Sequence, residues 1–138
     1  MFQALLYPAT DMTCASASYR RYTEDVTLTA GVMHWFIDHY MPPGVSRTDW
    51  RASPLRASSV AGAPPALVVT VGLDPLSDEG RAHAQRLEDE GVRVMALHLS
   101  DQLHGLAGQG NQVRAGNTVV DMVGLALHAA LRNNPPLA

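Results

Sequence analysis

The segment ALVVTVGLDPLSDEG, residues 66–80, joins an apolar run to an abrupt polar ending. Its first residues are apolar or β-branched, a composition typical of a strand that is buried on both faces. Gly72 closes the run, and Asp74 follows two residues later, directly before Pro75. The sequence therefore predicts a central strand over 66–72 with a carboxylate just beyond its carboxyl end.

Strands and helices alternate on both sides of this segment. Strands that alternate with helices form parallel sheets with right-handed crossovers, so the expected fold class is α/β, with a three-stranded, mostly parallel sheet and flanking helices. The expected strands cover residues 2–7, 66–72 and 93–100, and the expected helices cover residues 29–41, 77–90 and 117–132.

Local signals set the limits of these elements and the faces they bury. Thr29 and Ser77 are expected to cap the amino ends of their helices, and Gly91 is expected to end the helix that Ser77 begins. The strand at 2–7 is nearly continuously apolar, which predicts burial on both faces. The expected buried face of the last helix consists of Val119, Val120, Val123, Leu127 and Leu131.

The chain length and one long insertion define the expected domain organisation. A chain of 138 residues can form one domain with a core but not two. Residues 42–65 form an irregular segment that is too long for a simple turn. We therefore expect residues 1–138 to form a single partial domain, within which residues 11–65 form a cap-like helical excursion.

Composition narrows the class of protein further. The net charge of −3 is spread along the chain and gives no reason to expect nucleic acid as a partner. No apolar stretch approaches the roughly 20 residues of a membrane-spanning helix. The single cysteine, Cys14, allows no disulfide within the chain, which favours a cytoplasmic location. All ten basic residues are arginine, and together with abundant alanine this indicates a GC-rich bacterial genome.

Asp74 and His104 are the candidate catalytic residues. Each follows one of two neighbouring strands, and the working residues of parallel sheets lie at the carboxyl ends of strands. An aspartate that holds a histidine in one tautomer is the orienting half of a Ser–His–Asp triad. Spacing alone leaves alternatives open, since Asp before Pro is common in turns and His104 can be an ordinary surface histidine.

Several motifs, taken together, resemble a known family. The order and spacing of RASPL, GLDPLSDEG and LHG are similar to the C-terminal half of the hormone-sensitive-lipase-like esterases, which are α/β hydrolases of the bacterial carboxylesterase type. The resemblance extends to LLYPATD near the amino end and covers nearly the whole chain. It implies a partial α/β-hydrolase fold, a carboxylic ester as substrate, Asp74 as the triad acid and His104 as the triad base.

Two motifs of that family do not occur in the 138 residues. Neither the oxyanion motif HGGG nor the nucleophile elbow G-x-S-x-G is present, so no nucleophile is assigned. The chain by itself is therefore expected to have little or no esterase activity and to need an N-terminal half. The histidine loop, LSDQLHGLAG, also departs from the family pattern, with Asp101 three residues before His104.

Two other functions remain as alternatives. The chain can be a non-catalytic oligomeric remnant or binding module derived from an α/β hydrolase, with self-association covering its exposed apolar edges. The expected contact surfaces are VMALHLS, residues 94–100, or the first strand. A different doubly wound enzyme is disfavoured because the chain has no glycine-rich phosphate loop.

The remaining candidate residues receive structural interpretations. No cofactor or metal site is expected, since His34 and Asp38 share a helix face but two ligands do not make a site. Trp35 and Phe36 are expected in the core rather than in an acyl pocket. Asp78 and Glu79 are interpreted as charges that stabilise the amino end of a helix. Cys14 is interpreted as an inert thiol.

Overall fold

The computed structural model describes residues 1–132 as a three-stranded parallel sheet in the order β1–β2–β3, flanked by helices. This confirms the predicted partial α/β-hydrolase architecture. None of the helices within the described residues combines the length and apolar character needed to cross a bilayer. The elements are β1 (Gln3–Leu6), α1 (Ala17–Arg21), α2 (Ala30–Tyr40), η1 (Pro54–Arg56), β2 (Ala66–Leu73), α3 (Ser77–Asp89), β3 (Val94–Leu103), η2 (Leu106–Gln109) and α4 (Arg114–Arg132).

The central strand β2 is buried on both faces, as its composition predicts. Alternate side chains point to opposite faces of a strand, so each face of β2 joins a different cluster. Ala66 and Val68 pack towards α3, in a cluster with Leu87. The other face packs towards η2 and α4. The buried residues of that second cluster are Tyr7, Leu67, Val69, Val71, Leu106 and Val119.

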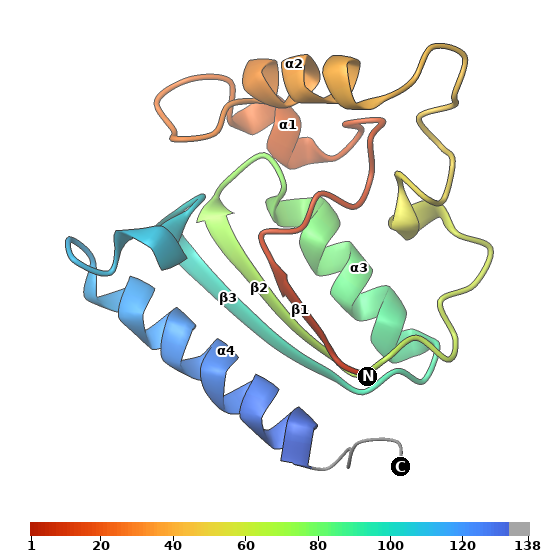
Figure 1. The fold of residues 1–138 in the computed structure, drawn as a ribbon. Coiled ribbons are helices and arrows are strands. Elements are labelled where there is room, and N and C mark those ends of the chain that lie inside the picture. The colour runs from red at the N-terminus through yellow and green to blue at the C-terminus, as the bar shows by residue number, and fades with distance from the viewer. Residues whose placement is uncertain (133–138) are drawn as a thin grey trace.

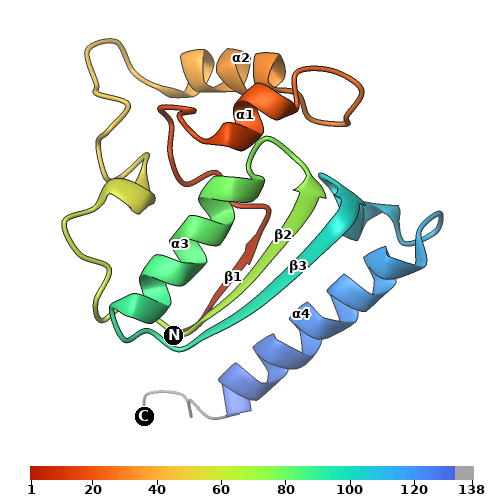
Figure 2. The same ribbon diagram turned by 180° about the vertical axis from the view of Figure 1, so that it is seen from behind.

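Helices cover both faces of the sheet. Figures 1 and 2 show α3 against one face and α4 against the other, with the three strands between them. The strands point towards α1 and α2, which lie over the carboxyl ends of the sheet. The amino ends of the strands lie at the opposite end, beside the last turns of α4. The sheet therefore has one end covered by the segment between β1 and β2, and one end that this segment leaves uncovered.

Two of the predicted helix boundaries are confirmed and one is wrong. The Thr29 hydroxyl accepts a hydrogen bond from the Val32 amide and caps α2. Gly91 adopts a φ of 83° beyond the end of α3, a conformation that glycine tolerates best. Ser77, in contrast, is the first helical residue of α3 and makes no cap hydrogen bond. Asp74 begins the turn before α3 instead, because its backbone carbonyl accepts the Ser77 amide.

Two burial predictions need correction. In the described residues β1 pairs only with β2, so this strand is half-buried rather than buried on both faces. In α4, Val119 is buried, but Val120, Leu127 and Leu131 are exposed. Successive helical residues are turned by about 100°, so these three exposed residues lie to one side of the face that contacts the sheet. The residues of α4 that pack on the sheet are Ala115, Val119, Val123 and Ala126.

Candidate active site

Asp74 lies in the turn between β2 and α3, with its side chain 1% exposed. Both carboxylate oxygens have partners. Oδ1 accepts the amide of Leu76 at 2.9 Å, and Oδ2 lies 2.8 Å from Nδ1 of His104. Asp74 is therefore both a turn residue and the partner of a histidine. Oδ1 stabilises the turn, and Oδ2 contacts the imidazole.

A register shift between β2 and β3 brings His104 to Asp74. Val71 pairs with Leu99, but Leu73 pairs with Leu103, so β3 contains two more residues than β2 over the same interval. This irregularity extends β3 to Leu103, three residues beyond the predicted end at 100. His104 follows directly and lies beside Asp74, which sits at the corresponding point beyond β2.

Gly72 makes this irregularity possible. A Cβ atom on Gly72 would lie 1.9 Å from the backbone oxygen of Ser100, far inside van der Waals contact. A glycine inside a strand often marks a bulge or a close approach of another backbone. The glycine at the end of the apolar run was therefore the available sequence signal for the register shift.

His104 is half-buried, with 29% of its side chain exposed. The Tyr7 ring lies 5.1 Å from the imidazole, centroid to centroid. Thr27, in the segment before α2, donates its hydroxyl to the backbone carbonyl of His104 at 3.0 Å. The histidine is thus contacted by side chains from the turn after β2, from the residue that follows β1 and from the excursion, while part of the ring stays accessible.

Glu79 was predicted to be a charge at the amino end of a helix. It lies in the first turn of α3, as predicted, but its carboxyl group is buried. Its side chain is 2% exposed, and Oε1 accepts the amides of Thr10 at 2.6 Å and Asp11 at 3.1 Å. Oε2 is buried and has no hydrogen-bond partner among residues 1–132. Burial raises the pKa of Glu79 to about 7, although the two amide hydrogen bonds act to lower it. Glu79 therefore joins α3 to the beginning of the excursion.

Asp78, the other residue of that pair, also makes a specific contact. Its carboxylate accepts the amide of Ser18, in the first turn of α1, at 2.9 Å. The Ser18 hydroxyl in turn donates to the Pro75 carbonyl, beside Asp74. Asp78 and Glu79 are therefore tethers between α3 and the excursion, and they are not a pair of acid–base groups facing one cavity.

An ion pair joins the two ends of the excursion. Arg56 donates from Nε and one terminal nitrogen to the two oxygens of Asp11, at 2.8 and 2.9 Å. Burial acts to raise the pKa of Asp11, but the hydrogen bonds from Arg56 and Thr13 outweigh it and hold the pKa below its usual value. Ser53, which is fully buried, accepts the Met12 amide nearby. Ser53 of the RASPL stretch and the adjacent Arg56 therefore join this part of the excursion to its first residues.

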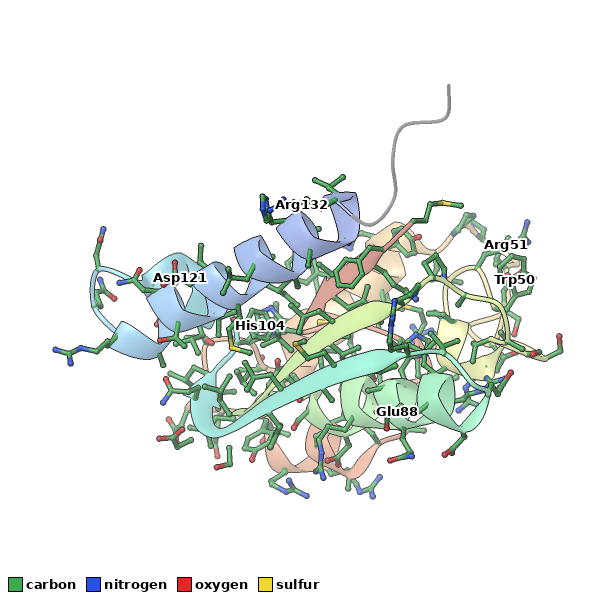
Figure 3. The ribbon with its side chains drawn as sticks, turned by 90° about the horizontal axis from the view of Figure 1, so that it is seen from below. Trp50, Arg51, Glu88, His104, Asp121 and Arg132 are labelled. Atoms are coloured by element: carbon green, nitrogen blue, oxygen red, sulfur yellow. The ribbon has the colours of Figure 1, made fainter. Side chains whose placement is uncertain are left out.

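The aromatic side chains of α2 correct one prediction. Trp35 is 56% exposed and Phe36 is 50% exposed, so neither belongs to the core of the described chain. The two rings contact each other edge to face, and His39 lies against Trp35. In Figure 3, Trp50 and Arg51 of the excursion also lie well away from His104. Trp35 and Phe36 therefore lie on the surface of the described part of the chain.

The other candidates lie apart from the pair as well. Asp38 forms an ion pair with Arg47 rather than joining His34. No three His, Cys, Asp or Glu side chains converge within residues 1–132 in a way that holds a metal ion. Burial raises the pKa of the Cys14 thiol, and its sulfur contacts the carbonyl of Met12. A raised pKa disfavours the thiolate, so Cys14 has little nucleophilic character.

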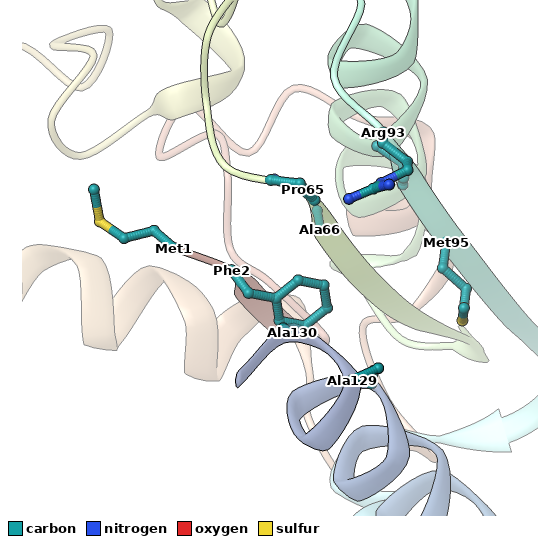
Figure 4. Close-up of a pocket in the computed structure, with 10 residues that line it drawn as sticks. Met1, Phe2, Pro65, Ala66, Arg93, Met95, Ala129 and Ala130 are labelled. Atoms are coloured by element: carbon teal, nitrogen blue, oxygen red, sulfur yellow. The ribbon is translucent and has the colours of Figure 1, made fainter. Parts of the chain in front are cut away.

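A hollow of about 520 Å³ lies at the other end of the sheet. Figure 4 shows Met1, Phe2, Arg93 and Met95 around it, with α4 closing one side through Ala129 and Ala130. Most of its lining is apolar, and it contains neither Asp74 nor His104. This hollow is therefore separate from the Asp–His pair, which lies at the carboxyl ends of the strands.

In parallel α/β folds the working residues lie beyond the carboxyl ends of the strands, and the contact between Asp74 and His104 lies at that end of this sheet. The alpha/beta hydrolase fold family matches residues 1–108, and the chain belongs to this family. The resemblance found in the sequence is thereby confirmed.

Two of the relatives that the chain matches are named as ester hydrolases. The chain is 33% identical over 129 residues to ethyl acetate hydrolase of Pseudomonas putida, and 38% identical over 106 residues to the carboxylic ester hydrolase LipN of Mycobacterium tuberculosis. Among solved structures, the thermophilic carboxylesterase EstE1, cloned from a metagenomic library, superimposes with a TM-score of 0.89 at 34% identity.

The chain matches only part of each relative. The alignments cover 94% of the chain but 41% of the Pseudomonas enzyme, and 76% of the chain but 28% of the Mycobacterium enzyme. The superposition on EstE1 covers 97% of the chain and 46% of that structure. The chain thus corresponds to less than half of each whole enzyme.

Proposed function

We propose that these 138 residues supply the acid and the base of a Ser–His–Asp triad for the hydrolysis of carboxylic esters. The observation that carries the proposal is the 2.8 Å contact between the buried Asp74 carboxylate and Nδ1 of His104. With Nδ1–H donating to Asp74, the neutral imidazole has its lone pair on Nε2. This is the tautomer that a general base requires. The ester hydrolases among the relatives support the same class of reaction.

In the proposed reaction, Nε2 of His104 takes the proton of a serine hydroxyl as the serine oxygen attacks the ester carbonyl. The resulting imidazolium is stabilised by Asp74, and it then gives its proton to the departing alkoxide as the carbon–oxygen bond breaks. A water molecule, deprotonated by the same nitrogen, then attacks the acyl-enzyme. As the bond between the acyl carbon and the serine oxygen breaks, the imidazolium returns the proton to that oxygen and the carboxylic acid is released. Asp74 stays ionised throughout and keeps the imidazole in one orientation.

The serine and the oxyanion donors come from outside these residues in this proposal. HGGG and G-x-S-x-G do not occur among them. One oxyanion donor contributes roughly 10²–10³ in rate. We therefore expect the 138 residues by themselves to show little or no turnover, and we expect activity when a segment that carries both motifs is present.

The proposal also assigns roles to the parts of the chain. Residues 1–138 act as one partial hydrolase domain, and residues 11–65 act as a cap over the carboxyl ends of the strands. The contact from Thr27 to the His104 carbonyl and the tether from Glu79 to Thr10 support a cap that is fixed to the site. We propose a cytoplasmic location because the single cysteine forms no disulfide within the chain.

The test is hydrolysis of p-nitrophenyl acetate and butyrate. The chain is assayed alone and together with an N-terminal hydrolase fragment that carries HGGG and the serine elbow. In the presence of the fragment, Asp74→Asn and His104→Ala are each expected to lower kcat by about 10⁴. Asp101→Asn is the matched control, since Asp101 is an exposed carboxylate three residues from His104 and is expected to leave kcat unchanged.

Three outcomes would overturn this proposal, and the first is an absence of turnover when the N-terminal fragment is present. Turnover by the chain alone that disappears in the Asp74→Asn, His104→Ala double variant would mean that another nucleophile has been recruited. Turnover with the fragment that is indifferent to both substitutions would remove Asp74 and His104 from the chemistry.

A second candidate function is a non-catalytic, self-associating module. It is favoured by the apolar surface that the described chain leaves exposed, including Trp35, Phe36 and Leu131. In this proposal β3 or β1 pairs with a second copy or with a complementary half, because a free strand edge presents unpaired backbone groups. Light scattering after size-exclusion chromatography tests it, and a strictly monomeric profile would count against self-association.

A further inference from the structure

Tyr7 occupies an unusual backbone position directly beside the site. Its amide donates to the Val69 carbonyl at 2.8 Å, so it continues the pairing of β1 with β2. Its φ is 49°, in the left-handed region that a bulky side chain rarely adopts. A non-glycine residue in this conformation is kept only where its surroundings hold it, and such residues cluster at functional sites.

The Tyr7 side chain makes two contacts with the segment that carries His104. The phenol ring lies 5.1 Å from the imidazole, with the planes inclined at 54°. The hydroxyl oxygen accepts the amide of Ala107 at 3.0 Å, and Ala107 belongs to the η2 turn that follows the histidine. Tyr7 is 8% exposed, and burial raises the pKa of its hydroxyl, which keeps it a neutral phenol.

One hydrogen bond does not fix the direction of an imidazole. The contact between Asp74 and Nδ1 holds one atom of the ring, and the ring can still pivot about that atom. The direction of Nε2, the nitrogen that would exchange protons with a substrate or a nucleophile, depends on a second restraint. Tyr7 provides one through its ring and another through the backbone that carries the histidine.

We infer that Tyr7 is a positioning residue for His104, which restrains the imidazole through its ring and the following turn through its hydroxyl. The inference rests on the proposed function only in naming His104 as the general base. The two restraints can be separated, because Phe keeps the ring and removes the oxygen, whereas Leu removes both.

The experiment is nitrogen-15 NMR of the 138-residue chain and its variants. In Tyr7→Phe the amide of Ala107 loses its acceptor, and its hydrogen exchange is expected to accelerate by about tenfold. In Tyr7→Leu the fraction of His104 in the Nδ1–H tautomer is also expected to fall. The control is Tyr40→Phe, which removes an exposed hydroxyl from α2 and is expected to change neither signal. Far-ultraviolet circular dichroism confirms that each variant retains its helices and strands.

Unchanged Ala107 exchange in Tyr7→Phe together with an unchanged His104 tautomer in Tyr7→Leu would overturn the inference. A catalytic measurement separates it from the proposed function. With the N-terminal fragment present, Tyr7→Leu is expected to lower kcat by about tenfold and to leave KM unchanged. If the wild-type chain shows no turnover with that fragment, the esterase proposal fails, while the tautomer measurement still decides the role of Tyr7.

Discussion

The two ends of the sheet differ in how their polar groups and cavities are arranged. At the carboxyl ends, Asp74 and Glu79 are buried and hydrogen-bonded to loops distant in the sequence. At the amino ends, the strands border an apolar hollow beside α4, where Met95 and Leu131 are exposed. Polar contacts thus fix one end, whereas the other is covered only in part by the described residues.

This difference has a physical consequence. A buried carboxyl group costs stability unless hydrogen bonds compensate its desolvation, so it is retained where it holds loops or performs chemistry. An exposed apolar surface costs little in the folded chain but favours association. We therefore expect substitutions at the carboxyl ends of the strands to change the Asp74–His104 site. We expect substitutions at the amino ends to change the association of the chain.

The largest expected effect on stability comes from a pair of leucines at the two ends. Leu106, in η2 beyond His104, is 1% exposed, whereas Leu131, near the end of α4, is 73% exposed. Leu106→Ala is expected to lower the free energy of unfolding by about 2–5 kcal/mol through the cavity it leaves. Leu131→Ala is expected to change it by less than about 0.5 kcal/mol. Urea denaturation followed by circular dichroism measures both.

The same two substitutions can show that the two ends of the sheet do not differ in this way. A cost above about 1 kcal/mol for Leu131→Ala, which disappears on dilution of the protein, would show that association buries the amino-end surface. Equal effects of the two substitutions at all concentrations would mean that the two ends do not differ in packing.

The next prediction concerns the pH dependence of the free energy of unfolding, to which Glu79 contributes at the carboxyl ends of the strands. The pKa of Glu79 is raised from 4.5 to about 7, so the folded state binds this proton more tightly than the unfolded state. Its contribution is most favourable below the unfolded pKa and is lost as the pH rises from 4.5 to 7, by about 3 kcal/mol. The free energy of unfolding is therefore expected to fall over this interval because of Glu79.

Glu79→Gln isolates this contribution. The amide oxygen can still accept the amides of Thr10 and Asp11, but the side chain no longer ionises. Burial lowers the pKa of His83, which acts in the opposite direction over the same interval in both proteins. The measurement is thus the difference between wild type and variant from pH 4.5 to 8. The variant should gain relative stability as the pH rises, and parallel curves would contradict the assignment.

The sequence was sufficient to predict the central strand and the pairing of Asp74 with His104. The apolar run before Gly72 is long and uniform, and residues beyond adjacent parallel strands meet at one edge. The extension of β3 to Leu103 was not predicted, because the polar residues at its end read as a loop. The register shift that carries them depends on the backbone of Ser100 approaching Gly72, a contact between segments 28 residues apart.

The burial of Glu79 and the exposure of Trp35 were missed for the same reason. A glutamate in the first turn of a helix is explained by the helix dipole, and nothing local indicates that the loop at Thr10 will cover it. An apolar residue of α2 is equally compatible with a core or with an uncovered surface. In both cases burial depends on whether an element far away in the chain covers the residue. The loop at Thr10 covers Glu79, and no part of the described chain covers Trp35.

The smallest expected effect lies on α4, which runs from the polar end of the sheet to the apolar end. A Cβ atom on Gly124 would meet no atom within 4 Å, whereas one on Gly116, near the start of the helix, would lie 2.5 Å from the Leu106 carbonyl oxygen. Gly124→Ala is expected to raise the free energy of unfolding by about 0.5–1 kcal/mol, since alanine loses less backbone entropy in a helix. Gly116→Ala is the matched control and is expected to destabilise. Thermal denaturation of both variants tests whether close packing of α4 is confined to its first turn, beside the site. A loss of stability in Gly124→Ala would show that the middle of this helix is also covered.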